Sequence, residues 1–542
     1  MTLARGRASV SGTLVTSSLP ADPTISLHLD TVDRHPGSVT LACLTGWIAP
    51  GAGLRIGSIG LRVGGSHVRL PYPFYRANVE GGTGDATPAG FCAVLPASLA
   101  IGPGPLSFTV SANGAWHGFA IEPSPGATVR VPLGPDTLLS PAPELSEIPG
   151  AEAGALLEDR LLATMARERR LTLRLDLINK CNLRCVMCHY SNEAIAGRPA
   201  QRITPEQFAA FFAPIAPMVR EVVLSCGDEP LMSPHFEAIL RELATRDPAV
   251  RIVFCTNGML MNARISAAIV AARVHRIMFS FDGVTSGTLH RIRVGSDFGR
   301  IVGNIVGLRE ARERAGGGVP AFVFNYVMMD SNIHEAPLFV EMARRLGGET
   351  IDFRHVVPMD TYDIAHEMLE RRPGKFNHYR RLIVAAAAAL GMDIYIPPEI
   401  ADAGAHDPSG DPAVTLGEFD ALVPPADAGS APAAARRPAG RPDRPAEAEF
   451  CFCDRPFTEV MIREQRDVYP CAWYKDRMGT LEGGAGLDEI FLGPEFQAVR
   501  RAMLDPGGAP GCRECPIKAN RLPTQLLGSG ARPAPAGQSL NT

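Results

Sequence analysis

The chain has 542 residues, enough for about two to four domains, and its 46% hydrophobic and 20% charged residues are typical of soluble globular proteins. A formal net charge of −4 excludes a chain-wide basic field for binding nucleic acid, although local arginine runs exist. Residues 1–29 lack the apolar core of a signal peptide, and no apolar run is long enough to span a bilayer, so we expect a cytoplasmic protein.

Residues 1–138 are predicted to form an all-β sandwich. Short apolar and β-branched runs alternate with Gly and Pro, and no helical period persists. The segments Thr45-Gly46-Trp47 and Ala89-Gly90-Phe91 resemble parts of the small β-domains attached to bacterial glycosyltransferases and other glycan-related enzymes. A generic accessory sandwich is the alternative interpretation.

A linker helix over residues 139–170 leads into a predicted α/β core at 171–400. Within the linker, apolar residues recur at helical spacing between positions 152 and 170. In the core, strand-like runs alternate with helical patterns, and six such repeats are too few for a closed eight-stranded barrel. We therefore predict a partial (β/α)6 TIM-like barrel whose strands lie at 171–178, 221–225, 252–255, 276–281, 321–328 and 350–353.

Three further segments follow the core. Residues 401–449 are rich in Ala, Pro, Gly and Asp with little periodicity, which is typical of a low-complexity linker. Residues 450–525 are predicted to form a small cysteine-rich domain. Residues 526–542 are again rich in Gly and Pro and are expected to be a disordered tail.

The most informative motif is the C-x3-C-x2-C run formed by Cys181, Cys185 and Cys188. A structural zinc site needs four ligands and a disulfide needs two. Three thiolates suit a 4Fe–4S cubane in which one iron stays open for a ligand that is not part of the protein. Twelve cysteines in a reducing compartment also favour metal or redox chemistry over disulfides.

The cysteine spacing, and the motifs that follow it, resemble the radical S-adenosylmethionine (radical SAM) superfamily. After the second predicted strand, Gly227, Asp228, Glu229 and Pro230 resemble the family's Gly-Gly-Glu-Pro motif, which holds the amino group of the cofactor. Asp228 stands where the family has its second glycine. The backbone supplies much of that contact in the family, so the resemblance implies that the departure is compatible with binding.

Four more positions match the family at later strand ends. The resemblance implies that Asn257 lies near the ribose, that Ser280 and Asp282 contact ribose hydroxyls, and that Val327 contacts adenine. It also implies that Arg293 binds the cofactor carboxylate, for which a planar guanidinium is well suited. No catalytic side chain beyond these ligands is identified.

The resemblance implies an activity and its cofactors. In this family the open iron chelates S-adenosylmethionine, and an electron from the cluster cleaves the sulfonium to give a 5′-deoxyadenosyl radical that abstracts hydrogen from a substrate. A flavodoxin- or ferredoxin-type protein would supply the electron. Cys226 and Cys255 lie beside the motifs, either as reactive thiols or as small buried hydrophobes.

Four cysteines near the C-terminus, Cys453, Cys471, Cys512 and Cys515, resemble the auxiliary-cluster modules known as SPASM and twitch. We predict that they ligate a second 4Fe–4S cluster, with Cys451 as a possible replacement for Cys453 or as an additional ligand. A four-cysteine zinc knuckle is the alternative on spacing alone.

The substrate is expected to be a carbohydrate or other small molecule, or a peptide. The predicted N-terminal sandwich favours a carbohydrate or cell-envelope substrate, or a role in docking a carrier or peptide. A peptide maturase is the nearest alternative. An alternative of another class is a non-catalytic iron–sulfur redox sensor or scaffold. The intact positions Glu229, Ser280, Asp282 and Arg293 argue against it.

Overall fold

The fold was analysed in a computed structural model of the chain. The structure describes residues 23–34, 41–51, 53–63, 66–70, 75–76, 89–94, 104–123, 126, 128–146, 162–163, 165–358, 362–401, 404–425, 453–463, 466–503, 509–512 and 515. Cys451, the tail at 526–542, most of the predicted linker helix and residues 426–449 of the predicted linker lie outside these residues. The chain divides into two compact units, the first being Met1–Leu162, Arg444–Asp454 and Ala498–Gln538, and the second Ala163–Asp443, Arg455–Gln497 and Ser539–Thr542.

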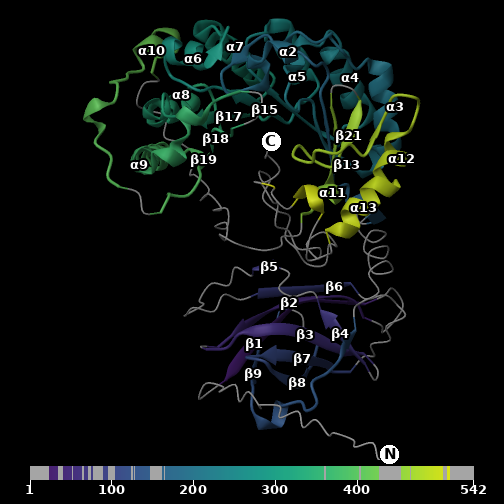
Figure 1. Cartoon of the computed structure of the whole chain (residues 1–542). Coiled ribbons are helices and arrows are strands. Elements are labelled where there is room, and N and C mark those ends of the chain that lie inside the picture. The colour runs from purple at the N-terminus through teal and green to yellow at the C-terminus, as the bar shows by residue number, and fades with distance from the viewer. Residues whose placement is uncertain are drawn as a thin grey trace, which may run out of the picture. The chain divides into compact units, whose positions relative to one another are not determined.

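The first unit contains two five-stranded sheets (Figure 1). One has the order β5 (Tyr75–Arg76), β6 (Ala89–Val94), β2 (Leu41–Pro50), β1 (Thr24–Arg34), β9 (Thr128–Pro132). The other has the order β10 (Leu145–Ser146), β4 (Ser66–Leu70), β3 (Ile56–Val63), β7 (Leu106–Ala112), β8 (Ala115–Ile121). Leu27 and Phe91 of the first sheet and Phe108 of the second belong to one buried apolar cluster, so the two sheets share a core.

The second unit is built on a ten-stranded sheet. Its order is β19 (Asp393–Tyr395), β18 (Thr350–His355), β17 (Ala321–Met328), β15 (Arg276–Ser280), β14 (Arg251–Thr256), β13 (Val219–Val223), β11 (Leu171–Leu175), β20 (Glu459–Ile462), β21 (Asp467–Tyr469), β22 (Gly479–Thr480). The pairings from β19 to β20 are all parallel, and those of β21 and β22 are antiparallel. All six predicted core strands are present, in an α/β arrangement consistent with a partial TIM-like barrel. The sheet also continues through β20 to β22, which the sequence analysis assigned to a separate small domain.

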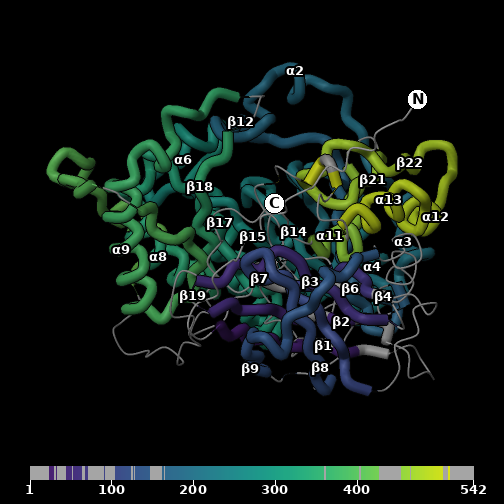
Figure 2. The backbone as a smooth tube through the Cα atoms, turned by 60° about the horizontal axis from the view of Figure 1, so that its bottom comes forward, coloured from purple at the N-terminus to yellow at the C-terminus, as the bar shows by residue number. Residues whose placement is uncertain are grey.

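Helices follow most of the parallel strands, and others lie near the C-terminal strands in the sequence (Figure 2). They are α2 (Glu193–Ala196), α3 (Pro205–Ile215), α4 (Phe236–Arg246), α5 (Ala263–Ala271), α6 (Ser286–Ile292), α7 (Phe298–Arg314), α8 (Ala336–Arg345), α9 (Pro373–Leu390), α10 (Gly417–Leu422), α11 (Arg455–Thr458), α12 (Leu487–Phe491) and α13 (Pro494–Ala502). Local signals place several starts. At α3, Thr204 and Gln207 form a reciprocal capping box and proline occupies the first turn.

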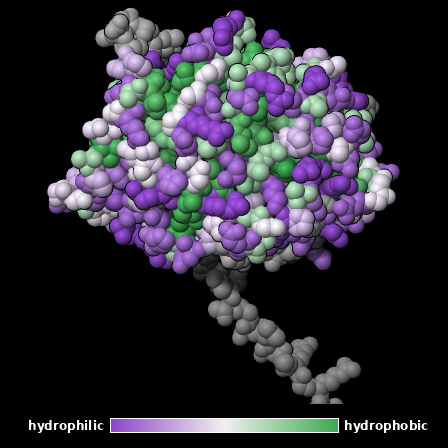
Figure 3. All heavy atoms as spheres, turned by 90° about the horizontal axis from the view of Figure 1, so that it is seen from above, coloured by the Kyte–Doolittle hydropathy of each residue, from purple (hydrophilic) through white to green (hydrophobic). Residues whose placement is uncertain are grey.

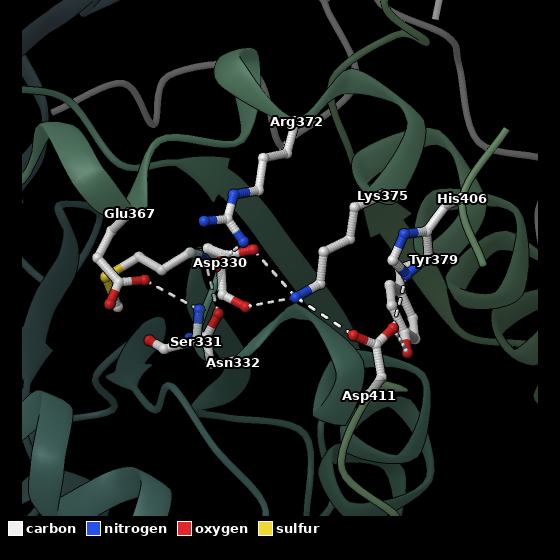
Figure 4. A network of polar contacts seen from close by, with 10 residues as sticks. Asp330, Ser331, Asn332, Glu367, Arg372, Lys375, Tyr379, His406 and Asp411 are labelled. Atoms are coloured by element: carbon white, nitrogen blue, oxygen red, sulfur yellow. Dashed lines mark hydrogen bonds and ion pairs between the residues drawn. The ribbon is translucent and has the colours of Figure 1, made fainter. Parts of the chain in front are cut away.

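Residues 404–425 differ from the prediction of a linker. They carry α10, whose Phe419 is fully buried beneath the guanidinium of Arg345 at 4.6 Å from the ring centroid. Asp411 in the same segment accepts hydrogen bonds from His406 and Tyr379 (Figure 4). One aromatic anchor and a few polar contacts thus order a segment whose composition indicates a linker.

Figure 3 shows hydrophilic and hydrophobic residues interspersed on one face of the molecule. Within the described residues, no helix combines the length and apolar character needed to cross a bilayer.

Candidate functional site

The predicted core motifs all lie at the carboxyl ends of parallel strands. The cysteine run follows β11, residues 226–230 follow β13, and Asn257 follows β14. Ser280 ends β15, Asp282 follows it, and Val327 lies near the end of β17. Because parallel strands end at one edge of their sheet, these groups share the position where ligands bind in such folds.

A short strand pair holds the cysteine loop. β12 (Arg184–Cys185) pairs antiparallel with β16 (Arg293–Val294), so that Cys185 lies opposite Arg293. The loop then turns back, with the amide of Cys188 donating to the Cys185 carbonyl at 3.0 Å. Cys185 is buried, and Cys181 and Cys188 are half-buried.

Arg293 connects this loop to a buried carboxylate. Its Nε lies 2.7 Å from Oδ2 of Asp282, and its Nη1 lies 3.7 Å from the Cys185 sulfur. Asp282 is completely buried, and its Oδ1 accepts the amide of Val327 at 2.7 Å. Burial raises the pKa of Asp282, an effect that the Arg293 charge opposes. Both oxygens of Asp282 therefore have protein partners, and in this structure the carboxylate holds Arg293 against the cysteine loop.

Glu229 connects the next two loops. Its Oε1 accepts the Thr256 hydroxyl at 2.7 Å, and its Oε2 accepts the amide of Asn257 at 2.8 Å. Burial raises the pKa of Glu229 to about 7. The side-chain Nδ2 of Asn257 donates to Oδ1 of Asn182 at 2.9 Å and lies 3.8 Å from the Cys181 sulfur. The structure thus brings Glu229 and Asn257 to the cysteine loop on the Cys181 side.

The departure at Asp228 has a local explanation. Its Oδ1 accepts the hydroxyl of Tyr190 at 2.6 Å, and Tyr190 lies two residues after Cys188. An aspartate at this position therefore fixes the loop after β13 to the end of the cysteine loop. Gly227 lies close to the same turn, since a Cβ there would come within 3.3 Å of the His189 ring. Pro230 is buried and begins a short 3-10 turn, Pro230–Met232.

Ser280 and the two extra thiols lie nearby. The Ser280 hydroxyl is 3.3 Å from the sulfur of Cys255. Cys255 also packs against a small apolar cluster that includes Val253 and Met278. Burial raises the pKa of both Cys226 and Cys255. These surroundings favour the interpretation of Cys255 as a small, unreactive side chain.

Comparison with known proteins identifies the core. Residues 175–343 match the Radical SAM superfamily. The chain contains a radical SAM domain. Members of this superfamily are enzymes that use a 4Fe–4S cluster and S-adenosylmethionine.

Two relatives are similar over this region. An AdoMet-dependent heme synthase of Methanosarcina barkeri is 28% identical over 194 residues, which cover 36% of this chain and 52% of the relative. A probable GTP 3′,8-cyclase of Methanosarcina acetivorans is 28% identical over 200 residues, covering 36% and 57%. The chain thus spans about half the length of the curated relatives it matches. Among solved structures, Streptococcus suis SuiB bound to S-adenosylmethionine has a TM-score of 0.44 and 12% identity over 67% of this chain and 79% of that one.

The donor set of the radical SAM domain fits a cluster with an open iron. Burial, with smaller contributions from Glu229 and the neighbouring thiols, raises the pKa of Cys181 to about 12, and burial raises that of Cys185 to about 11. Three thiols thus lie within electrostatic range of one another, beside the Arg293 cation and amide donors such as that of Leu183, 3.5 Å from the Cys181 sulfur. N–H···S contacts of this kind are a feature of iron–sulfur ligation, and binding would release the thiol protons. No set of three His, Cys, Asp or Glu side chains suited to a single metal ion is found among the described residues.

The radical SAM domain contains one site residue that the sequence analysis missed. Asp176, just after β11, is buried and accepts the amides of Cys226 at 2.6 Å and Gly227 at 3.2 Å through the same oxygen. Burial raises its pKa to about 6 against the effect of these amides. The available signal was an acidic residue inside the otherwise apolar run at 175–178.

The four cysteines proposed for the second cluster are divided between the two units. Cys453, Cys512 and Cys515 belong to the first unit and Cys471 to the second. Cys453 and Cys471 are buried, and Cys512 and Cys515 are half-buried. Burial raises the pKa of Cys471, while the amides of Trp473 and Tyr474 lower it. The four-cysteine set stays a prediction.

Proposed function

We propose that the chain is a radical SAM enzyme that reductively cleaves S-adenosylmethionine and abstracts hydrogen from a carbohydrate or other small-molecule substrate, or from a peptide. The observation that supports this most strongly is the contact of Arg293 with both Cys185 and Asp282. It joins the cysteine loop to the strand ends on one side, as Asn257 and Glu229 do on the other. When bound, the cluster and S-adenosylmethionine supply the electron transfer and the carbon-centred radical for hydrogen abstraction.

We assign different residues of the chain to different parts of S-adenosylmethionine. Arg293 has N–H groups beyond those that face Asp282 and Cys185, and a guanidinium can hold the carboxylate of the methionine moiety in fork geometry. We assign the loop at 227–230 to the amino group, an assignment supported by the hydrogen bond from Tyr190 that fixes Asp228. We assign Asn257 and Ser280 to the ribose side and Val327 to adenine.

An apolar cover adjoins the cysteine loop. Val186 and Met187 pack against a buried cluster from the later strand ends, formed by Ile292, Met329, Val356 and Ile364. Excluding water strengthens electrostatic interactions and limits side reactions of reactive species. This cover therefore suits a site that handles a radical.

The remaining parts of the proposal concern the ends of the chain. We assign Cys453, Cys471, Cys512 and Cys515 to an auxiliary 4Fe–4S cluster of the SPASM or twitch type, which would take an electron from a substrate radical. The first unit would be an accessory sandwich that docks the substrate. A flavodoxin- or ferredoxin-type donor would reduce the cluster in the radical SAM domain.

The deciding experiment is anaerobic reconstitution of the full chain, followed by reduction with dithionite in the presence of S-adenosylmethionine. We expect 5′-deoxyadenosine from the wild type, and none from Cys185→Ala because one iron loses its ligand. Cys43→Ala in β2 is the matched control and should behave as the wild type. Full iron loading without any cleavage would instead support the redox-sensor interpretation, and turnover by Cys185→Ala would reject the assignment of the site.

A further inference from the structure

A row of polar residues crosses four neighbouring strands of the barrel. Ser280 of β15 pairs in register with Asn325 of β17, Asn325 with Asp352 of β18, and Asp352 with Tyr395 of β19. Residues that are in register in a parallel sheet point to the same face. The four side chains therefore form one continuous row, which we call the polar row.

The face that carries the polar row is open. Along β17, Asn325 and Val327 are partly exposed, whereas Phe324 and Tyr326 are fully buried and contact Phe339 of α8. Because α8 covers the outer face of the sheet, the partly exposed side chains of Asn325 and Val327 point to the inner face of the barrel. Below the polar row, the inner face is apolar, with a floor formed by Val223, Val253, Met278, Val323 and Cys255.

Two acceptors in the polar row lack donors. Oδ1 of Asn325 and Oδ1 of Asp352 have no hydrogen-bond partner among the described residues. The other oxygen of Asp352 is paired with Arg354, and the amide nitrogen of Asn325 has only the distant Cys255 sulfur at 3.7 Å. Buried acceptors are normally satisfied, so two unfilled ones on adjacent strands indicate a bound group that donates hydrogen bonds.

We propose that the part of the polar row beyond Ser280, formed by Asn325, Asp352 and Tyr395, is the substrate-binding wall, and that it takes a neutral ligand with adjacent hydroxyl groups, such as a sugar or polyol. Ser280 itself is assigned to the ribose of S-adenosylmethionine and marks where this wall meets the cofactor. Arg354 already neutralises Asp352, so a cationic amine would gain little over a hydroxyl. The row lies one step along β17 from Val327, whose amide holds Asp282. A ligand there is next to the Arg293 network, so this inference rests on the proposed function and names its substrate class.

Binding can be tested without turnover. Saturation-transfer difference NMR on the reconstituted full chain with S-adenosylmethionine, without reductant, would use methyl β-D-glucoside and glycerol as probes. Dioxane, which only accepts hydrogen bonds, and the cation ethylenediamine are the comparison compounds. We expect saturable transfer to the two hydroxyl compounds and little to the others. Equal or stronger binding of ethylenediamine or dioxane, or no transfer to either hydroxyl compound, would overturn the proposal.

Substitutions in the polar row test whether the hydroxyl compounds bind there. Asn325→Leu should weaken glucoside binding about fivefold or more, because one acceptor is lost. Asp352→Leu, which removes the second acceptor, is an independent variant and should weaken glucoside binding by a similar factor. Glu341→Gln on the exposed side of α8 is the control and should bind as the wild type. Unchanged binding in both row variants, with iron content and circular dichroism intact, would refute the assignment.

A turnover experiment distinguishes failure of this inference from failure of the proposed function. With dithionite and perdeuterated glucoside, deuterium in 5′-deoxyadenosine would support both. Hydroxyl-dependent binding without any 5′-deoxyadenosine would refute the proposed function and support the wall as a binding site. Formation of 5′-deoxyadenosine without hydroxyl-dependent binding would refute the wall alone.

Discussion

Arg293 contacts two groups of the site through different atoms of its guanidinium. Its Nε faces the Asp282 carboxylate and its Nη1 approaches the Cys185 sulfur. Asp282 is fully buried, so removing the cation would leave an uncompensated charge in the interior. Breaking a buried pair in this way costs about 3–5 kcal/mol, far more than the loss of an exposed ion pair.

The first prediction concerns this pair. Arg293→Met should lower the free energy of unfolding by about 3 kcal/mol, as measured by urea denaturation of the metal-free chain. The double variant Arg293→Met with Asp282→Asn should recover part of that loss, because the buried carboxylate is then neutral. Equal losses in the two variants would show that the ion pair is not the cause.

The second prediction concerns Asp176. Asp176→Ala removes the acceptor for the backbone amides of Cys226 and Gly227. We expect S-adenosylmethionine to bind about tenfold more weakly, because a tenfold loss of affinity corresponds to the net free energy of one or two hydrogen bonds. Asp176→Asn keeps a carbonyl oxygen for the same amides and should retain affinity within a few-fold. Isothermal titration with the reconstituted protein measures both, and equal behaviour of the two variants would contradict this positioning role.

Residues differ in how far the sequence alone could place them. Cys181, Cys185 and Cys188 were predictable because their chemistry depends on local spacing. Tyr190 with Asp228, Asp176 and the polar row were not, because their contacts depend on the register between strands that lie far apart in the sequence. The departure of Asp228 from the family motif is explained only by its hydrogen bond with Tyr190, which the sequence does not predict.

Among the secondary-structure elements, α9 is linked to two loops by the ion pairs of one lysine. Lys375 lies 3.0 Å from Oδ1 of Asp330, after β17, and 3.5 Å from Oδ1 of Asp411, in the segment before α10 (Figure 4). Burial opposes ionisation of Asp411, but the His406 and Tyr379 hydrogen bonds and the Lys375 charge outweigh it and lower its pKa to about 2. Little in this segment's composition predicts such contacts, whereas the long alternating strands and helices of the barrel were predictable from their periods.

The third prediction follows from this pKa. A depressed pKa stabilises the fold above the ordinary value near 4, and the stabilisation is lost as the pH falls towards 2. Asp411→Asn should therefore be less stable than the wild type by about 2 kcal/mol at pH 7, and the difference should narrow below about pH 4. Thermal unfolding from pH 7 to pH 3 measures it, and a constant difference would exclude the charge as its source.

At the scale of the whole chain, the two units differ in what they contribute to the proposed chemistry. The residues assigned to the cluster and to S-adenosylmethionine lie between positions 176 and 327. Among the described residues, the core shared by the two N-terminal sheets is formed by residues between positions 25 and 133. The radical SAM domain and its α/β fold were predictable from the order of the motifs and from the alternation of strands and helices. The extension of the barrel sheet by β20 was not, because nothing local in a four-residue strand specifies a partner almost three hundred positions earlier.

The fourth prediction concerns the first unit. Deletion of residues 1–146 should leave the cleavage of S-adenosylmethionine within about twofold of the full chain, because domains with their own cores fold separately. Iron analysis and 5′-deoxyadenosine formation measure this. Loss of iron from the shortened chain would show that these residues are needed to build the site.

The fifth prediction concerns the C-terminal cysteines. Cys471→Ala should lower total iron from about eight to about four per chain, the content of one cubane. Zinc in the wild type, detected by elemental analysis, would support a zinc knuckle instead. Cys43→Ala again provides the control, with unchanged metal content.

The pairing of β20 with β11 has a consequence for biosynthesis. While the chain emerges from the ribosome, the strand that precedes the cysteine run has a neighbour on one side only, β13. An unpaired edge of this kind is a template for aggregation, and it persists until nearly the whole polypeptide has been made. A transcript truncated before codon 459 would yield a barrel with this edge uncovered, so chaperone dependence and inclusion-body formation should rise sharply at that boundary.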